Sequence, residues 1–211
     1  MIFRRAAKSN AVEVPQPSLL GDPKDWLYSV PTICDEIPRA LLPASGVEGQ
    51  VYRLHEDDWR QFELVSLAHM SSVDLNLAEI RNVREQRIGP GFPSVHARPE
   101  PRDPLAGVLL THRELATAVG PVVKDYARVG YLGQDTWIAD SFAFEIADAV
   151  TAYGLESEGV LQVVCFAGAK QDAARRLIAK VTPLLGSHSL ILVAWEAAVS
   201  YPPRPNAVPS T

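Results

Sequence analysis

The segment from Val160 to Trp195 constrains the fold more than any other part of the chain, because an amphipathic stretch separates two apolar runs. The first run reads VLQVVCF and the second reads LILVAW, with apolar residues at both odd and even positions. Since side chains alternate between the two faces of a strand, each run predicts a strand that is buried on both sides. The unit is therefore expected to be strand, helix, strand.

The amphipathic stretch predicts a helix over Ala169–Leu185. Its apolar residues follow the spacing of one helical face: Ala174, Leu177, Ile178, Val181 and Leu185. Gly186 is expected to end the helix in a left-handed conformation. The connection is long enough to join two adjacent parallel strands, and it fits equally well a split arrangement with a third strand inserted between them.

The remaining elements indicate the fold class. Strands are expected over Gln50–His55 and Trp59–Ser66, on either side of the acidic turn Glu56-Asp57-Asp58; a helix that starts at Asp57 or Asp58 is the alternative. Further strands are expected between residues 122 and 155. A helix begins at Ser71 or Ser72, and another begins after the capping box at Thr111. Strands that bunch together, with helices at irregular intervals, predict an α+β fold. We expect a mixed, mostly antiparallel sheet with helices packed mainly on one face.

Proline content suggests how the chain is divided. Residues 1–47 and 201–211 are rich in proline and carry little periodicity. We expect a partly ordered arm over 1–47, a single α+β domain over 48–200 and a flexible tail over 201–211. A core of this size requires no metal or disulfide for stability.

Composition and charge limit the classes of partner that the protein is expected to bind. The formal net charge of −5 gives no reason to expect nucleic-acid binding. No apolar run reaches the length of a membrane span, and the first residues lack the apolar core of a signal peptide. With only two cysteines in the chain, a cytoplasmic location is expected.

The acidic residues are unevenly distributed. Between Val129 and Ala169 there is no lysine or arginine, so this segment carries −6 while the rest of the chain carries +1. Its acids are Asp135, Asp140, Glu145, Asp148, Glu156 and Glu158. Together with Asp57 and Asp58 they are candidates for a surface that attracts a protein partner with a basic surface. The alternative interpretation is a solvated face balanced by basic residues elsewhere.

The sequence lacks the common catalytic motifs. The chain contains no P-loop, GxSxG, HExxH or CxxC motif, so no metal or organic cofactor is predicted. This favours a non-catalytic binding or inhibitory protein, for example an immunity-type protein that neutralises a toxin. One alternative is a small enzyme with a metal-assisted site near His55, Asp57 and Asp58, or near His96 and Arg98. Another is an assembly subunit that forms homo-oligomers through its proline-rich arms.

Overall fold

The computed structural model of the chain describes residues 27–38, 41–43, 49–99, 101, 103–169 and 171–202. Within these ranges the helices are α1 (Met70–Glu85), α2 (His112–Val119) and α3 (Gln171–Ser187). The strands are β1 (Thr32–Cys34), β2 (Leu41–Pro43), β3 (Val51–Leu54), β4 (Phe62–Ser66), β5 (His96–Arg98), β6 (Val122–Tyr126), β7 (Arg128–Tyr131), β8 (Thr136–Ile138), β9 (Ser141–Ile146), β10 (Val150–Ser157), β11 (Val160–Ala167), β12 (Leu190–Ala194) and β13 (Val199–Tyr201).

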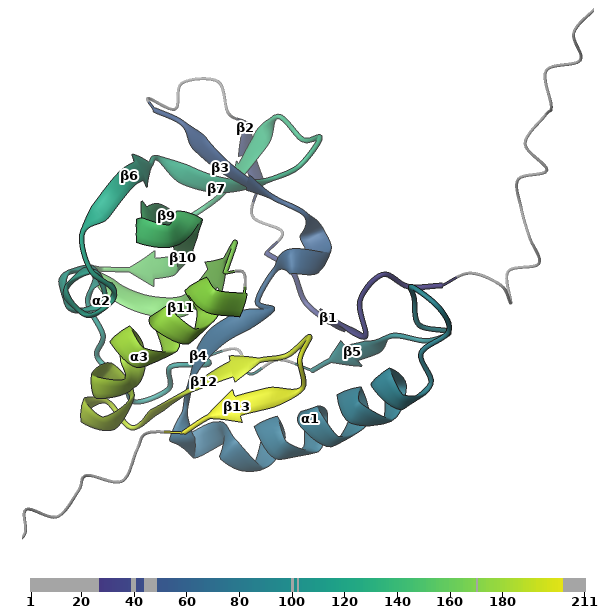
Figure 1. Ribbon diagram of the computed structural model, residues 1–211. Helices are drawn as coiled ribbons and strands as arrows, with labels where there is room; N and C mark the ends of the chain where they lie inside the picture. The colour runs from purple at the N-terminus through teal and green to yellow at the C-terminus, as the bar shows by residue number, and fades with distance from the viewer. Residues whose placement is uncertain are drawn as a thin grey trace, which may run out of the picture.

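A seven-stranded sheet forms the centre of the molecule, in the order β13-β12-β4-β11-β10-β9-β6 (Figure 1). Every pair of neighbouring strands in it is antiparallel. Among the described strands, three two-stranded pairs accompany it: β1-β5, β2-β8 and β3-β7. The predicted α+β class with a mostly antiparallel sheet is therefore confirmed.

The unit built from β11, α3 and β12 is the split form of the two predicted topologies. Both strands pair antiparallel with β4, so they run parallel to each other with β4 between them. Leu177, Val181 and Leu185 of α3 pack against one face of this sheet together with Leu64 and Leu192.

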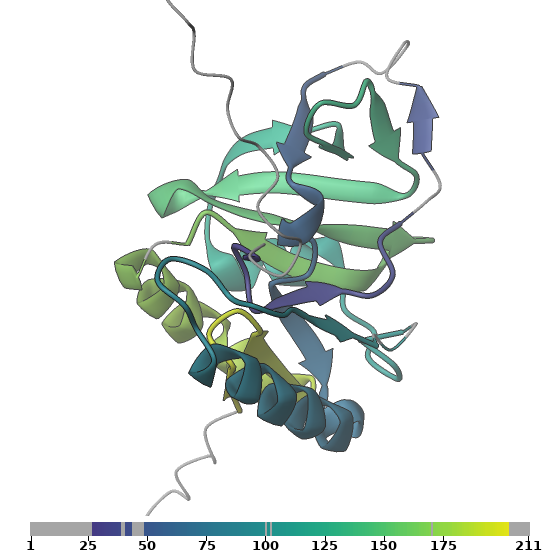
Figure 2. The ribbon, with the colours of Figure 1, turned by 90° about the vertical axis from the view of Figure 1, so that its right-hand side faces the viewer.

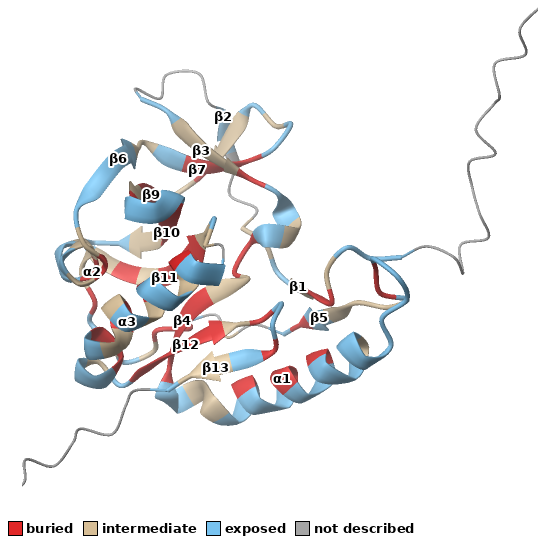
Figure 3. Cartoon of the chain, viewed as in Figure 1, coloured by how far each residue is buried: buried red, intermediate tan, exposed pale blue. Residues whose placement is uncertain are grey.

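Helix α1 covers the opposite face of the same strands. Its buried residues Val73, Leu77 and Ile80 pack with Ile191 and Val193 of β12. Because alternate residues of β12 meet α3 and α1, both of its faces are apolar, which explains the pattern seen in the sequence. Figures 2 and 3 show the two helices on either side of these buried strands.

Two helix ends differ from the sequence-based expectation. Helix α1 begins at Met70, and its N-cap residue, His69, makes no side-chain cap hydrogen bond. The prediction of a cap at Ser71 or Ser72 was wrong because a 3₁₀ turn, η3 (Leu67–His69), leads straight into the helix. Gly186 lies inside α3, and the left-handed residue follows later, at Ser189 with φ 53°. The capping box at Thr111 is confirmed.

The two strands expected around the acidic turn are both present, but they do not pair with each other. β3 pairs in parallel with β7, while β4 lies in the central sheet. The 3₁₀ turn η2 (Glu56–Asp58) joins them and carries the chain from one sheet to the other. The interface between the layers contains Trp59, Tyr131 and Tyr153.

The described part of the predicted arm contacts the body of the protein. Tyr28 forms a bridge with Phe92, and β1 pairs in parallel with β5. Residues 1–26 and 203–211, which hold much of the predicted arm and tail, lie outside the described residues. The domain boundaries remain predictions. None of the helices in the described ranges is long and apolar enough to cross a membrane.

Candidate functional site

A cleft of about 600 Å³ opens where the β3–η2 segment meets the carboxyl ends of β11 and β12. The start of α3 and the last residue of β13 complete its border. Its lining comes from Tyr52, Arg53, Leu54, His55, Asp58, Gln61, Phe62, Arg84, Leu132, Phe166, Ala167, Gly168, Ala169, Ala174, Ala194, Glu196, Ala197 and Tyr201. The cleft therefore brings together residues that are far apart in the sequence.

Aromatic rings and small side chains make up the apolar part of the cleft. The rings of Phe62 and Phe166 meet edge to face, with their centroids 6.1 Å apart. Five alanines join them: Ala167, Ala169, Ala174, Ala194 and Ala197. Since alanine has no atoms beyond Cβ, these positions leave open the volume that larger side chains would occupy.

Both arginines of the cleft donate to backbone carbonyl groups. Arg53 Nη1 lies 2.6 Å from the carbonyl oxygens of both Gln134 and Thr136 and so holds the turn between β7 and β8. Arg84 Nη1 donates to the carbonyl of Glu196, in the turn between β12 and β13. These contacts fix the positively charged groups against the protein.

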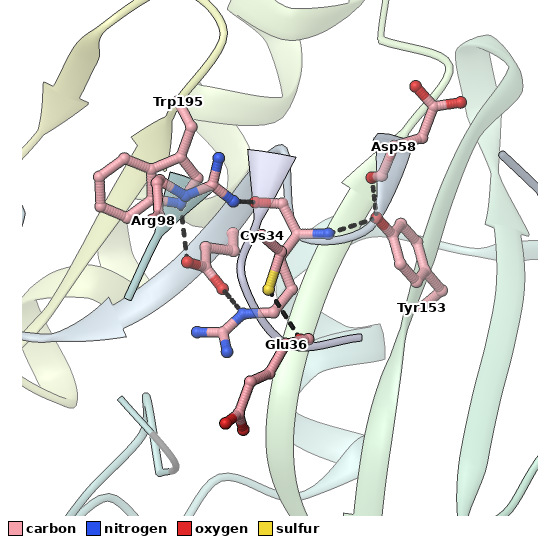
Figure 4. Close-up of polar contacts among 8 residues, drawn as sticks. Cys34, Glu36, Asp58, Arg98, Tyr153 and Trp195 are labelled. Carbon is pink, nitrogen blue, oxygen red and sulfur yellow. Dashed lines mark hydrogen bonds and ion pairs between the residues drawn. The ribbon is translucent and has the colours of Figure 1, made fainter. Parts of the chain in front are cut away.

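The η2 turn forms one wall of the cleft and contains three of the residues singled out in the sequence. His55 caps it, since its Nδ1 accepts a hydrogen bond from Asp57 N at 3.2 Å, and the same Nδ1 lies 3.5 Å from the Asp57 carboxylate. Asp58 receives the Tyr153 hydroxyl on its carbonyl oxygen at 2.8 Å. In Figure 4 its carboxylate points away from Tyr153.

A second acidic turn lies beside η2. The side chain of Gln134 donates to Glu56 Oε1 at 2.8 Å, and Asp135 is the next residue along the chain. Of the eight acidic residues predicted to bind a partner, the structure thus brings Asp57, Asp58 and Asp135 to one corner of the molecule.

The other five predicted acids are distributed over β9, β10 and their turns. Asp140 and Glu156 meet through a backbone hydrogen bond of 2.8 Å, and Glu158 lies in the following turn. Asp148 is at the opposite end of β9, where Arg176 binds it with two hydrogen bonds of 2.9 Å that lower the pKa of the carboxyl group.

The acids on these strands have polar or basic neighbours within the protein. Glu145 pairs with Lys124 across the strands and accepts a hydrogen bond of 3.3 Å from the Tyr126 hydroxyl. Glu156 lies 3.8 Å from the His112 ring. A role for these strand residues in binding a partner remains a prediction.

A buried polar cluster packs beside the η2 turn and stabilises it (Figure 4). Arg60 Nε donates to Glu63 at 2.7 Å, and the Trp195 indole donates to the other carboxylate oxygen, also at 2.7 Å. The Arg98 guanidinium stacks 4.8 Å from the centre of the Trp195 ring and donates to Thr32 Oγ1 and the Arg60 carbonyl. All four of these charged or aromatic side chains are at most 6% exposed.

This cluster stabilises an unusual backbone conformation. Arg60 has φ 57°, which is rare for a residue with a side chain. Its backbone N–H donates to the Tyr153 hydroxyl at 3.2 Å, so Tyr153 contacts both Asp58 and Arg60. The cluster thereby holds the last part of the turn that leads into β4.

His96 and Arg98 share one parity of β5, as expected, but they contact protein atoms. His96 Nε2 lies 2.8 Å from Asn76 Oδ1, and burial lowers the pKa of its imidazole. Arg98 is fully buried in the cluster described above. Their positions tie β5 to α1 and to the central sheet.

Sequence reasoning missed the roles of Arg60, Glu63 and Tyr153. A signal was available, because Glu63 is a single acid within the strand FELVS, three residues after an arginine. A lone charge in a strand buried on both faces needs a partner, since isolated buried charges are costly. Its other partner, Trp195, and Arg98, which stacks on that indole, could not be found by spacing.

The chemistry of the cleft fits ligand binding. Its lining combines apolar side chains with two phenols, two carboxylates, two guanidinium groups, one imidazole and one amide, and with no serine, threonine, cysteine or lysine among the described lining residues. Within the part of the chain that the structure describes, no group of three or more metal-binding side chains is assembled. Comparison of the chain with protein-family models, curated proteins and solved structures gave no match.

Proposed function

We propose that this protein is a binding module that holds a segment of a partner protein in the cleft. The observation that carries this proposal is the cleft itself, whose lining combines phenylalanine rings and five alanines with exposed charged residues, among them Asp58, Arg84 and Glu196. A volume of about 600 Å³ lies within the range of sites that hold ligands, and such sites combine apolar walls with a few polar groups.

An edge strand beside the cleft supports a polypeptide as the occupant. β13 pairs only with β12 among the described strands, and its last residue, Tyr201, lines the cleft. Backbone groups on the outer edge of such a strand can pair with an extended peptide, while neighbouring pockets accept its side chains. A peptide segment could use both features at once.

A rigid site also favours binding. The buried cluster around Glu63 holds the turn that forms one wall, and Arg53 and Arg84 fix the two turns beside it. A site that is already ordered loses less conformational entropy when it binds. The specific form that we propose is an inhibitory, immunity-type protein that covers the basic surface of a toxin.

Two residues of the metal-assisted alternative line the cleft, although among the described residues they belong to no metal-binding group of three. His55 and Asp58 both line the cleft, and Asp57 is adjacent to them. Titration with Zn²⁺ or Mn²⁺ while the His55 NMR signals are followed tests this alternative. Saturable shifts at micromolar metal would favour it over simple peptide binding.

Selection from a random peptide display library tests the proposed function. The wild-type protein should enrich related peptides, whereas the Ala174→Phe variant should lose them because the larger side chain fills the cleft. Ala78→Phe, on the exposed face of α1, is the matched control and should select the same peptides as the wild type. Undiminished selection by Ala174→Phe would show that the cleft is not the binding site.

A further inference from the structure

We infer that the segment held in the cleft carries a lysine or arginine next to an apolar residue, with its cationic end between Asp58 and Glu196. This inference rests on the proposed function and specifies the chemistry of the partner. Its evidence is the balance and arrangement of charge around the apolar part of the cleft.

The cleft lining carries two carboxylates, those of Asp58 and Glu196, and two guanidinium groups, those of Arg53 and Arg84. The η2 turn adds the carboxylates of Glu56 and Asp57 beside the cleft. These six side chains carry a formal net charge of −2. Asp135, in the neighbouring turn, adds to the negative potential there.

The carboxylates differ from the arginines in what remains available to a ligand. Arg53 and Arg84 each direct at least one donor at backbone carbonyl groups. The carboxylates of Asp58 and Glu196 are exposed and make no hydrogen bond or ion pair with other described residues. These two carboxylates are therefore the strongest hydrogen-bond acceptors that the cleft presents to a ligand.

The apolar part of the cleft suits the stem of a long basic side chain. Lysine and arginine bury their methylene groups against apolar surface while their charge stays at a polar rim. The faces of aromatic rings also attract a cation. Phe62 and Phe166 provide apolar surface, and Tyr52 and Tyr201 also line the cleft. An uncharged apolar residue of the same segment can occupy the space over the alanines.

The alternative occupant of the cleft is a segment with an acidic side chain. The start of α3 lies at the cleft, and a helix N-terminus attracts negative charge. An acidic side chain would nevertheless approach Asp58 and Glu196 and be repelled by both. The observations therefore favour the basic segment, and the acidic one becomes an outcome of the test.

The experiment starts from a peptide that the library selection yields. Its basic residue is replaced by norleucine in one synthetic version and by glutamate in another, and the affinities are measured by fluorescence anisotropy at low salt. The lysine or arginine version should bind tightest and the glutamate version weakest.

Charge-neutral variants then locate the contact. Asp58→Asn and Glu196→Gln should each weaken binding of the basic peptide about 2–5-fold, as expected for exposed ion pairs, and leave the norleucine peptide unchanged. Asp74→Asn, on the exposed side of α1, is the control and should change neither.

The outcomes separate the two proposals. If no peptide is selected, the proposed function fails. If selected peptides lack a basic residue, or if the glutamate version binds as well as the lysine version, cleft binding stands and this inference is overturned. Equal losses for the basic and norleucine peptides in Asp58→Asn would also overturn it.

Discussion

The buried carboxylate of Glu63 should contribute more to the stability of this protein than its exposed acids do. Glu63 lies in the middle of the central sheet, opposite Val193 on one side and Cys165 on the other, and is 0% exposed. Arg60 and the Trp195 indole donate to its two oxygens at 2.7 Å. In Glu63→Gln, the amide can satisfy only one of these donors, and its own N–H groups face the other.

The expected magnitude follows from the loss of a buried ion-pair partner. Removing one member of such a pair typically costs about 3–5 kcal/mol, because the other charge stays buried without compensation. For a chain of this length each kcal/mol lowers the melting temperature by about 2–4 °C, so Glu63→Gln should melt roughly 6–20 °C lower. Urea unfolding followed by circular dichroism measures the difference in free energy directly.

Glu145→Gln is the matched control, since that carboxylate is part-buried and accepts a hydrogen bond of 3.3 Å from the uncharged Tyr126 hydroxyl. It should cost less than about 1 kcal/mol. The double variant Arg60→Met with Glu63→Met should lose less stability than the sum of the two single variants, because neither charge is then left alone. If Glu63→Gln is no more harmful than Glu145→Gln, the argument about buried charge is refuted.

Three further predictions concern the frame around the cleft. Leu177→Ala should destabilise the protein by about 2–5 kcal/mol, since this α3 side chain is 2% exposed in the core, and an unchanged urea midpoint would contradict its packing. Tyr153→Phe removes the hydroxyl that donates to the Asp58 carbonyl and accepts from the Arg60 N–H. It should lower the free energy of unfolding by about 1–3 kcal/mol and increase amide exchange at the η2 turn. Unchanged amide exchange would show that the hydroxyl does not stabilise that turn. Burial lowers the pKa of His96 in the folded protein. Below the ordinary pKa of 6.5 the unfolded state therefore binds more protons than the folded state, and the free energy of unfolding should fall as the pH drops through that value. The fall should be less steep in His96→Gln. Identical pH profiles for the two proteins would rule out this contribution.

Local sequence patterns predicted the central unit well. The apolar runs and the helical stripe between them depend on residues near one another in the chain, and α3 meets the sheet through Leu177, Val181 and Leu185 as expected. The choice between an adjacent and a split arrangement could not be made, because it depends on where β4 pairs. That pairing is between segments about a hundred residues apart, which no local period encodes.

The candidate site was predicted only in part. The turn chemistry around His55, Asp57 and Asp58 indicated an exposed acidic turn, and the structure places two of these three residues in the cleft lining. The surrounding residues come from β11, α3, β12 and β13. Glu196 in particular gave no signal of its own, since its relevance depends on the turn between β12 and β13 facing the η2 turn.

The alanines explain both why the cleft exists and why it could not be predicted from the sequence. A buried strand or helix normally fills the space beside it with large side chains, because interiors are closely packed. Here Ala167, Ala174 and Ala194 occupy positions at the ends of β11, the start of α3 and the end of β12, where these elements converge. A single alanine at one of these positions would not create an opening, and the cleft arises only because the three elements converge.

The cluster around Glu63 supplies the rigidity that an open site would otherwise lack, since it links β4, the start of β1, β5 and the end of β12. A buried charged cluster is a costly way to stabilise a fold. Because Arg60 of this cluster and Asp58 of the turn share the Tyr153 hydroxyl, the cluster fixes the shape of the cleft as well as the fold.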